Sequence, residues 1–242
     1  MKDFAVLNTR SSPVQIVPIV RAELRLSEPG WEFARTHAAE IDAHWRRRSA
    51  EQPKLFNGDV LMLHKWSLAD GCFRGECLTA DFKSLLYWRE NEAPDDAVLD
   101  FFGAPALHSR EGWLIVGRMG PDHSSAGAIY FPCGTLHPSD VVGQSIDLDG
   151  GILRELNEET GLTFSPVELD APLLIFDSHR LAFIRPIHST RAAAEIIHDI
   201  ERHLARTPEP ELAGIVVVKG RDDIDTASIP PCVIAYIDRA FA

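Results

Sequence analysis

The chain has 242 residues, of which 45% are apolar and 25% charged, a balance typical of a soluble globular protein. This length allows one large domain, or one domain with a substantial extension. The net charge of −12 argues against a nucleic-acid polymer as the main partner, because binding a phosphate backbone requires a basic surface. It does not exclude small phosphorylated ligands, since a divalent cation can bridge acidic side chains to phosphate oxygens.

Neither an export signal nor a membrane span is recognisable in the sequence. The first residues, MKDFAVLNTRSSP, lack a sustained apolar core, and apolar runs such as 214–218 fall far short of the roughly 20 residues that span a membrane. The cysteines, Cys72, Cys77, Cys133 and Cys232, show neither a CxxC pair nor zinc-ligand spacing. We therefore expect a cytoplasmic protein with reduced thiols and no membrane partner. The alternative is a disulfide between Cys72 and Cys77, which could lie across a hairpin.

The first part of the chain is expected to combine strands and helices. Pro18 interrupts a run of β-branched residues, which favours an edge strand or an irregular one. The expected elements are a strand (14–26), a helix (28–53), a hairpin turning at ADG (58–80) and a short helix capped by Asp81 (81–90). A polar segment with three acids follows (91–97), and we place a domain boundary there. It divides an N-terminal extension (1–95) from the main domain (96–242).

The main domain is expected to alternate strands with helices. Its expected elements are two strands (112–119 and 128–134), a loop and a helix (143–162), two strands joined at DSHR (172–189), an amphipathic helix (191–206), a strand (211–220) and a helix with prolines in its first turn (228–242). This order predicts a mixed α/β domain with helices on both faces of a sheet.

Three glutamates occupy one face of the predicted helix in 143–162. Glu155, Glu158 and Glu159 are three and four residues apart, so they repel by about 0.2–0.5 kcal/mol per pair in an isolated helix. Arg154, as the direct neighbour of Glu155, points to a different side. A solvated acidic face is the ordinary interpretation of such a run. A cluster of carboxylate oxygens is also the set of ligands that Mg²⁺ or Mn²⁺ prefers.

The ends of this helix can be placed from its glycines and acids. We expect it to begin at about Gly151, with Asp149 as the capping residue and a long loop in front. Gly161 occupies the position that favours a left-handed conformation, where a helix stops. Leu162 could then fold back onto Leu156.

The sequence RELNEETGL (154–162) resembles the second half of the Nudix box, the signature of the Nudix hydrolase family. The residues that fill its seven defined positions are Arg154, Glu155, Leu156, Glu158, Glu159, Gly161 and Leu162. The flanks AIYFPCGTL (128–136) and GWLIVGRM (112–119) look like the strands that precede the box. The resemblance covers roughly residues 100–242, and the N-terminal region resembles the front part of some larger members. It implies an α/β (α+β) protein, a Nudix-type α/β/α sandwich with a mixed sheet and an N-terminal α+β extension.

The first half of the box departs from the family pattern. The glutamate and the glycine of that half would fall at Ile146 and Asp140, and neither residue fits. Gln144 replaces the glutamate of a frequent Gly-Glu-Ser sequence, and two residues are added before Arg154. Gln144 supplies no charge, so Asp147 and Asp149 are the candidates to supply it.

Carried over by position, the resemblance implies a metal centre on this helix. Glu155, Glu158 and Glu159 would bind Mg²⁺ or Mn²⁺, with Glu155 either a ligand or the general base that acts on water. Arg154 would orient the glutamates by charge-assisted hydrogen bonds. The backbone carbonyl of Cys133 would be a further metal ligand. The catalytic residues implied are therefore Glu155, Arg154 and Glu159.

Other residues outside the box are candidates for the same site. Some family members take a catalytic glutamate from elsewhere, and Glu209 and Glu211 precede a predicted strand. Solvated loop acids are the ordinary interpretation of this pair. Arg118 and His123 lie in the glycine-rich connection 117–127 and could bind substrate, although a plain hairpin loop is the ordinary interpretation there.

The resemblance thus predicts a Mg²⁺-dependent pyrophosphohydrolase. It would cleave a phosphoanhydride bond in a nucleoside diphosphate linked to another moiety, with a nucleotide sugar as the first candidate. The alternative is a catalytically inactive Nudix-fold module with a nucleotide-binding or regulatory role. The changed first half of the box favours this alternative. The expected partner is a small nucleotide-type molecule, and the sequence is compatible with a homodimer.

Overall fold

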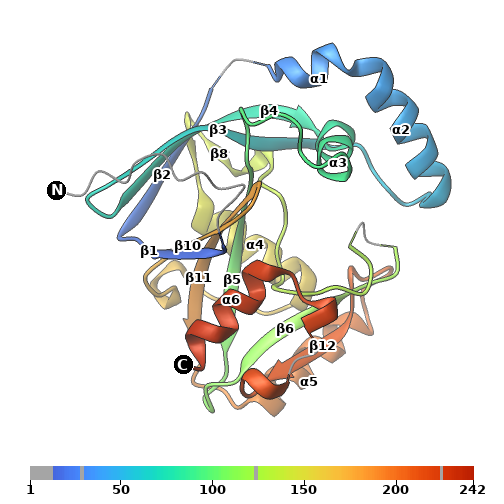
Figure 1. Ribbon diagram of the computed structural model, residues 1–242. Coiled ribbons are helices and arrows are strands. Elements are labelled where there is room, and N and C mark those ends of the chain that lie inside the picture. The colour runs from blue at the N-terminus through green and yellow to red at the C-terminus, as the bar shows by residue number, and fades with distance from the viewer. Residues whose placement is uncertain (1–12, 28–29, 123–124, 224–225) are drawn as a thin grey trace.

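The computed structural model describes residues 13–27, 30–122, 125–223 and 226–242, whose strands form two sheets (Figure 1). The larger sheet has the order β1-β10-β11-β5-β6-β12, with β7 paired to β6. Its strands are β1 (Gln15–Pro18), β5 (Asp100–His108), β6 (Leu114–Met119), β7 (Ile129–Tyr130), β10 (Leu173–Asp177), β11 (Arg180–His188) and β12 (Leu212–Val218). Because β11 and β5 run parallel while the other pairs are antiparallel, the sheet is mixed.

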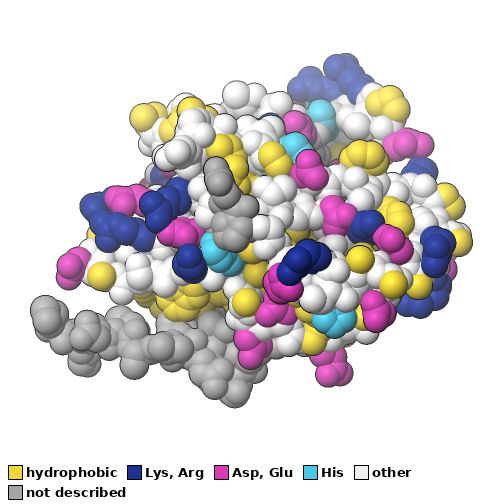
Figure 2. Space-filling model, turned by 90° about the horizontal axis from the view of Figure 1, so that it is seen from above, with side chains coloured by type: hydrophobic (Ala, Val, Ile, Leu, Met, Phe, Trp, Pro, Cys, Tyr) yellow, Lys and Arg dark blue, Asp and Glu magenta, His cyan; other side chains and the backbone are white. Residues whose placement is uncertain are grey.

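The smaller sheet has the order β3-β4-β2-β9-β8. Its strands are β2 (Arg21–Leu26), β3 (Asp59–Ala69), β4 (Cys72–Asp81), β8 (Val141–Val142) and β9 (Ser145–Ile146). The helices beside it are α1 (Glu32–Thr36), α2 (Ala38–Glu51) and α3 (Phe82–Glu90). On the side of the molecule that carries this sheet and α2, acidic and basic side chains lie next to one another (Figure 2).

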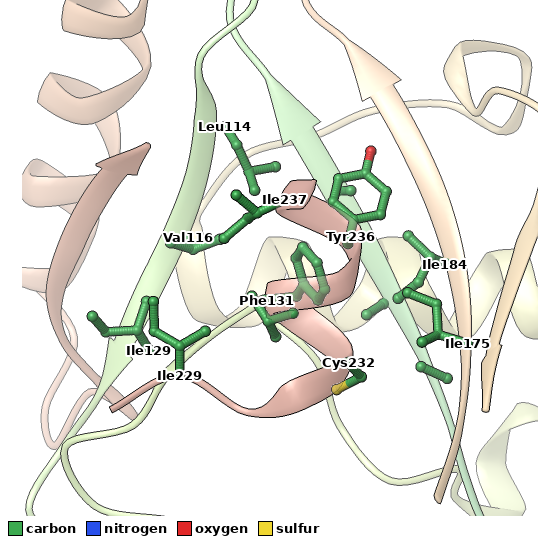
Figure 3. Packing of buried hydrophobic residues seen from close by; sticks show 14 of the residues in the cluster. Leu114, Val116, Ile129, Phe131, Ile175, Ile184, Ile229, Cys232, Tyr236 and Ile237 are labelled. Carbon is green, nitrogen blue, oxygen red and sulfur yellow. The ribbon is translucent and has the colours of Figure 1, made fainter. Parts of the chain in front are cut away.

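Three further helices cover the larger sheet. They are α4 (Leu148–Thr160), α5 (Ala193–Leu204) and α6 (Pro231–Ala240). On β5, Phe102 and Ala104 belong to an apolar cluster with Ile237 of α6 (Figure 3). Phe101 faces the other way and shares a cluster with Ile152 of α4, and α5 packs beside α4 against β12. The sheet therefore lies between α6 and the pair α4 and α5, which confirms the predicted α/β/α sandwich.

The N-terminal elements follow the sequence prediction in part, since the single helix predicted over 28–53 is two helices, α1 and α2, that meet at His37. The strand predicted over 14–26 splits after Pro18 into β1, at an edge of the larger sheet, and β2, in the smaller one. The hairpin β3–β4 turns at Asp70 and Gly71, which both have positive φ. Asp81 caps α3, since its side chain accepts a hydrogen bond from the Ser84 amide at 3.2 Å. The boundary near residue 95 stays a prediction, and strands from both sides of it meet in both sheets.

One strand was missed by the sequence prediction, and another was predicted too long. The sequence interpretation missed β5, whose nine residues are all buried, because Gly103 and Pro105 interrupt its β-forming pattern. Pro105 fits because β6 pairs only with the last two residues of β5, so no β6 residue needs its missing amide. The strand predicted over 128–134 is only the two residues of β7. Within the described residues, no helix is long and apolar enough to cross a membrane.

Candidate active site

The helix that carries the three glutamates, α4, begins earlier than predicted. It starts at Leu148 rather than at about Gly151, and its cap is Asp147 rather than Asp149. The Asp147 side chain accepts a hydrogen bond from the Gly150 amide at 3.0 Å. A Cβ at Gly150 would stand 2.3 Å from an Asp147 carboxylate oxygen, so this cap needs glycine there. The glycines are thus part of the first turn.

The long loop before α4 is a small hairpin. β8 and β9 pair across a turn at Gly143, whose φ is +67°, and β9 adds to β2 of the smaller sheet. Gln144 is exposed and contributes its backbone carbonyl, which accepts a hydrogen bond from Leu26 at 3.1 Å. Asp149 pairs with Arg185 of β11 at 2.9 Å. The altered first half of the box therefore joins two sheets and fixes α4 on β11.

The other end of α4 is as predicted. Gly161 is left-handed with φ of +72°, and its amide donates to the carbonyl of Asn157 at 2.7 Å. Leu162 and Leu156 are both buried in one apolar cluster. A Cβ at Gly161 would stand 2.6 Å from the ring of His203 on α5, so the helix end is also closely packed.

The three glutamates differ sharply in burial. The side chain of Glu158 is 58% exposed and that of Glu155 19%, whereas Glu159 is 5% exposed as a whole residue. Among the described residues, neither carboxylate oxygen of Glu159 forms an ion pair or a hydrogen bond of good geometry, although the nearby Cys133 amide favours the charged form and opposes the rise of its pKa. Burial, together with the charges of Glu211 and Glu155, raises the pKa of Glu159 to about 9. This face of α4 is therefore partly buried, and a solvated acidic face does not describe it.

Glu155 lies directly against the turn that precedes the hairpin. A Cβ at Gly134 would stand 2.5 Å from the carboxyl carbon of Glu155, so only glycine leaves this space. Burial raises the pKa of Glu155, and the neighbouring Arg154 opposes that shift. Burial and then the charge of Glu159 raise the pKa of the Cys133 thiol. The Cys133–Gly134 turn thus lies beside the carboxylates, as the motif implied, and the metal role of the Cys133 carbonyl stays a prediction.

Arg154 forms ion pairs with three acids. It contacts Glu155 at 2.7 Å, Asp140 at 3.0 Å and Glu158 at 3.1 Å. Burial lowers the pKa of Arg154, but the hydrogen bond to Asp140 and the charge of Glu155 outweigh this effect, so its pKa is above the usual value. Arg154 is therefore placed to orient two of the glutamates.

Asp140 is a residue of the site that the sequence interpretation missed. It is buried, accepts a hydrogen bond from the His137 amide at 2.9 Å and holds Arg154 with its other oxygen. The signal was present as an acid at the position where the family pattern has glycine. A Cβ on Gly151 would stand 3.2 Å from the Asp140 carboxyl carbon, so α4 and Asp140 pack closely.

Of the two acids predicted from outside the box, the structure brings Glu211 to the cluster. Its charge raises the pKa of both Glu159 and Glu155. The Gly120 amide donates to the Glu211 carbonyl at 2.7 Å, which ties the end of β6 to the start of β12. Glu209 instead forms an ion pair with Lys54 at 3.1 Å.

In the part of the chain that it describes, the structure does not connect the two predicted substrate contacts, Arg118 and His123, to the carboxylates of α4. Arg118 is exposed on β6, and its guanidinium donates to the Gly127 carbonyl at 3.5 Å. Within the described chain, no hydrogen bond or ion pair joins Arg118 to the carboxylates of α4. His123 lies outside the described residues.

The donor chemistry of this cluster suits a hard divalent cation. Carboxylate oxygens are the preferred ligands of Mg²⁺, and within the described residues the buried oxygens of Glu159 have no cation and no hydrogen bond of good geometry to satisfy them. In the part of the chain that is described, no three His, Cys, Asp or Glu side chains are already close enough to hold an ion together. Arg154 occupies Glu155 and Glu158 instead.

Comparison with known proteins places the chain beside several solved structures. No family model matches it, and no curated protein matches it. It is similar to the MutT protein of Methanosarcina mazei Go1, at 16% identity and a TM-score of 0.42, over 59% of this chain and 92% of that one. A Nudix hydrolase of Nitrosomonas europaea is 14% identical, with a TM-score of 0.39 over 59% and 88% of the two chains. The Nudix hydrolase RenU of M. smegmatis is 12% identical, with a TM-score of 0.35 over 57% and 80%.

Proposed function

We propose that this chain is a metal-dependent hydrolase of the Nudix type. It cleaves a phosphoanhydride bond in a nucleoside diphosphate linked to another moiety, and a nucleotide sugar is the first substrate to test. The observation that carries this proposal is the buried Glu159 carboxylate, which lies beside Glu155 and Glu211 and has no ion-pair partner in the described chain. It stands on the helix whose sequence resembles the Nudix box.

Burial of the Glu159 carboxylate costs folding free energy. A buried polar group without a hydrogen bond, surrounded by like charges, destabilises a fold unless something compensates it. The only cation that contacts the cluster in the described residues is Arg154, and its ion pairs go to Glu155, Glu158 and Asp140 rather than to Glu159. A divalent cation would supply the missing positive charge and would suit the oxygen donors.

The roles of the residues follow from their positions. Glu155, Glu158 and Glu159 would hold Mg²⁺ or Mn²⁺, with the Cys133 carbonyl as a further donor. When bound, the ion neutralises phosphate charge and makes bound water more acidic. Glu155 would accept a proton from the attacking water if it does not bind the ion.

The remaining residues would support this centre. Arg154 orients Glu155 and Glu158, and Asp140 fixes Arg154. Glu211 is the additional acid from outside the box. Arg118 and His123 remain candidates for substrate contacts.

The direct test replaces Glu159 by glutamine. We expect Glu159→Gln to reduce Mg²⁺-dependent turnover by on the order of 100-fold or more, because the bound ion supplies several kcal/mol and each ~1.4 kcal/mol is tenfold in rate. Turnover is measured as phosphate release, with phosphatase coupling, over a panel that includes ADP-ribose, a nucleoside diphosphate glucose, coenzyme A and a dinucleoside polyphosphate. The matched control is Glu201→Gln, an exposed acid on α5. Unchanged turnover in Glu159→Gln would show that the assignment is wrong.

A binding module without catalysis is the second candidate function. Two observations favour it, namely the uncharged, exposed Gln144 and the ion pairs that Arg154 forms with Glu155 and Glu158. Thermal unfolding with Mg²⁺ and the same nucleotide panel separates the two functions. Stabilisation by a nucleotide without any phosphate release would support the binding module.

A further inference from the structure

The connection between α2 and β3, residues 52–58, is joined to segments that carry residues of the candidate active site. Figure 1 shows it on the same side of the molecule as the loop that follows β6. Lys54 anchors it there, because its ammonium group contacts Asp122 at 2.9 Å and Glu209 at 3.1 Å. Asp122 follows Gly120, whose amide binds the Glu211 carbonyl, and Glu209 is two residues before Glu211. One end of the connection is thus fixed to the two segments that bring Glu211 to the carboxylates.

The strand that follows the connection is joined to another segment that borders the glutamates. The Leu61 amide of β3 donates to the Leu136 carbonyl at 2.8 Å. The segment that contains Leu136 also contains Gly134, the residue against which the Glu155 carboxylate lies. The chain between Lys54 and Leu61 therefore runs from a residue paired with the segments around Glu211 to a strand paired with the segment that contains Gly134.

Phe56 lies between these two anchors and is 81% exposed. It is the only aromatic residue among the strongly exposed large apolar side chains of the described residues; the others are Val20, Leu26, Val142 and Val167. Its ring lies over Gly58, where a Cβ would stand 3.2 Å from a ring carbon. An aromatic ring exposed to this extent contributes little to the apolar core, because burial is the source of that stabilisation.

We propose that Phe56 stacks on the aromatic base of the substrate and so selects nucleotides over phosphoanhydrides that lack a base. The inference rests on the proposed function, because it assumes that the phosphates lie at the carboxylates. Base stacking on an aromatic side chain is favourable and tolerates different bases, since each base has a π-face. Phe56 contributes affinity and position for the base, and the chemistry stays with α4.

The surroundings of Phe56 favour a small planar ligand over a protein partner. Lys54, two residues before Phe56, is ion-paired, and the side-chain oxygen of the neighbouring Asn57 accepts a hydrogen bond from the Lys83 backbone amide at 2.8 Å. A stable protein interface buries an area that one ring cannot supply. A single exposed ring, on a connection joined to the segments around the carboxylates, matches a nucleotide, which joins an aromatic base to anionic phosphates.

Binding of ADP with Mg²⁺, measured by titration calorimetry on the full chain, tests the proposal. We expect Phe56→Ala to weaken ADP binding by about tenfold and Phe56→Trp to retain it. Val167→Ala, at an apolar side chain that is 91% exposed next to β10, is the matched control and should leave binding unchanged. Methylenediphosphonate, which has no base, should bind all four proteins alike.

Three results would overturn the stacking role. They are an unchanged ADP affinity in Phe56→Ala, an equal loss of methylenediphosphonate affinity, and wild-type protein that does not bind ADP. Unfolding temperatures of the variants show whether the fold is kept, and an exposed ring should not alter them. If ADP binds through Phe56 but no compound of the panel is hydrolysed, the hydrolase proposal fails while the stacking site stands.

Discussion

Acidic residues in the smaller sheet and the buried acid Glu159 on α4 differ in whether they have cationic partners. On β2 and β4, Glu23 contacts Arg21 at 2.7 Å and Arg74 at 3.0 Å, and Arg74 lies directly across the strands from it. Glu76 is likewise surrounded by Arg25 and Lys65. Hydrogen bonds from these arginines lower the pKa of both glutamates.

On α4 the balance is reversed. Glu159 is buried, has no ion-pair partner among the described residues and lies near three further acids, Glu211, Glu155 and Glu158, so its pKa is raised to about 9. Acids that serve the fold are matched with cations from the chain itself, whereas Glu159 has no matching cation. The difference indicates that α4 is arranged for a positive charge from outside the chain, at a cost to stability without it.

The strongest test of this comparison is the stability of Glu159→Gln without metal. In EDTA at pH 8, we expect the free energy of unfolding to rise by about 1–3 kcal/mol, because the native state no longer holds an unpaired buried carboxyl. Added Mg²⁺ should raise the unfolding temperature of the wild type and leave that of Glu159→Gln unchanged. Both are measured by urea and thermal denaturation followed by circular dichroism.

Glu76→Gln is the matched control for this test. It removes an acid that is already paired, so we expect an unchanged response to Mg²⁺ and no gain in stability. If Glu159→Gln also destabilised the metal-free protein, or kept the Mg²⁺ response, Glu159 would be an ordinary structural acid.

The close contact between Gly134 and Glu155 gives the next largest effect. We expect Gly134→Ala to reduce turnover by about tenfold, because the new methyl group would stand 2.5 Å from the Glu155 carboxyl carbon and displace it. Gly214→Ala is the control, since a Cβ there meets no atom within 4 Å. Equal activity of the two variants would show that the position of Glu155 against this turn is unimportant.

The predictable part of the site is the part that its local sequence determines. The face shared by the glutamates follows from helical spacing, and the left-handed end follows from Gly161. The start of α4 was misplaced because Asp147 and Asp149 are both acceptable caps. In the structure Asp149 pairs with Arg185, a contact between distant parts of the chain, and Asp147 caps the helix.

The rest of the site depends on contacts between distant parts of the chain. Glu211 reaches the cluster because β12 pairs with β6, and Asp140 reaches Arg154 because the hairpin before α4 joins the smaller sheet. The strand β5, which carries α4 on one face and α6 on the other, was missed because Gly103 and Pro105 lower its local β-propensity. Tertiary packing decided these features, and no local pattern contains that information.

His64 offers the smallest test, within the sheet whose acids are paired. Its ring bonds Ser27 at 2.8 Å, and burial, followed by the charge of Lys65, lowers its pKa despite the opposing charge of Glu76. The unfolded chain therefore takes up a proton at His64 before the native protein does. The contribution of His64 to stability is complete above its unfolded pKa of about 6.5 and is lost as the pH falls below that value. Urea denaturation from pH 7.5 to 5.5 should show a smaller loss of stability in His64→Gln than in the wild type, and identical slopes would contradict this. The paired glutamates are distinguished by pH, since their contribution is lost only at lower pH, below the ordinary glutamate range.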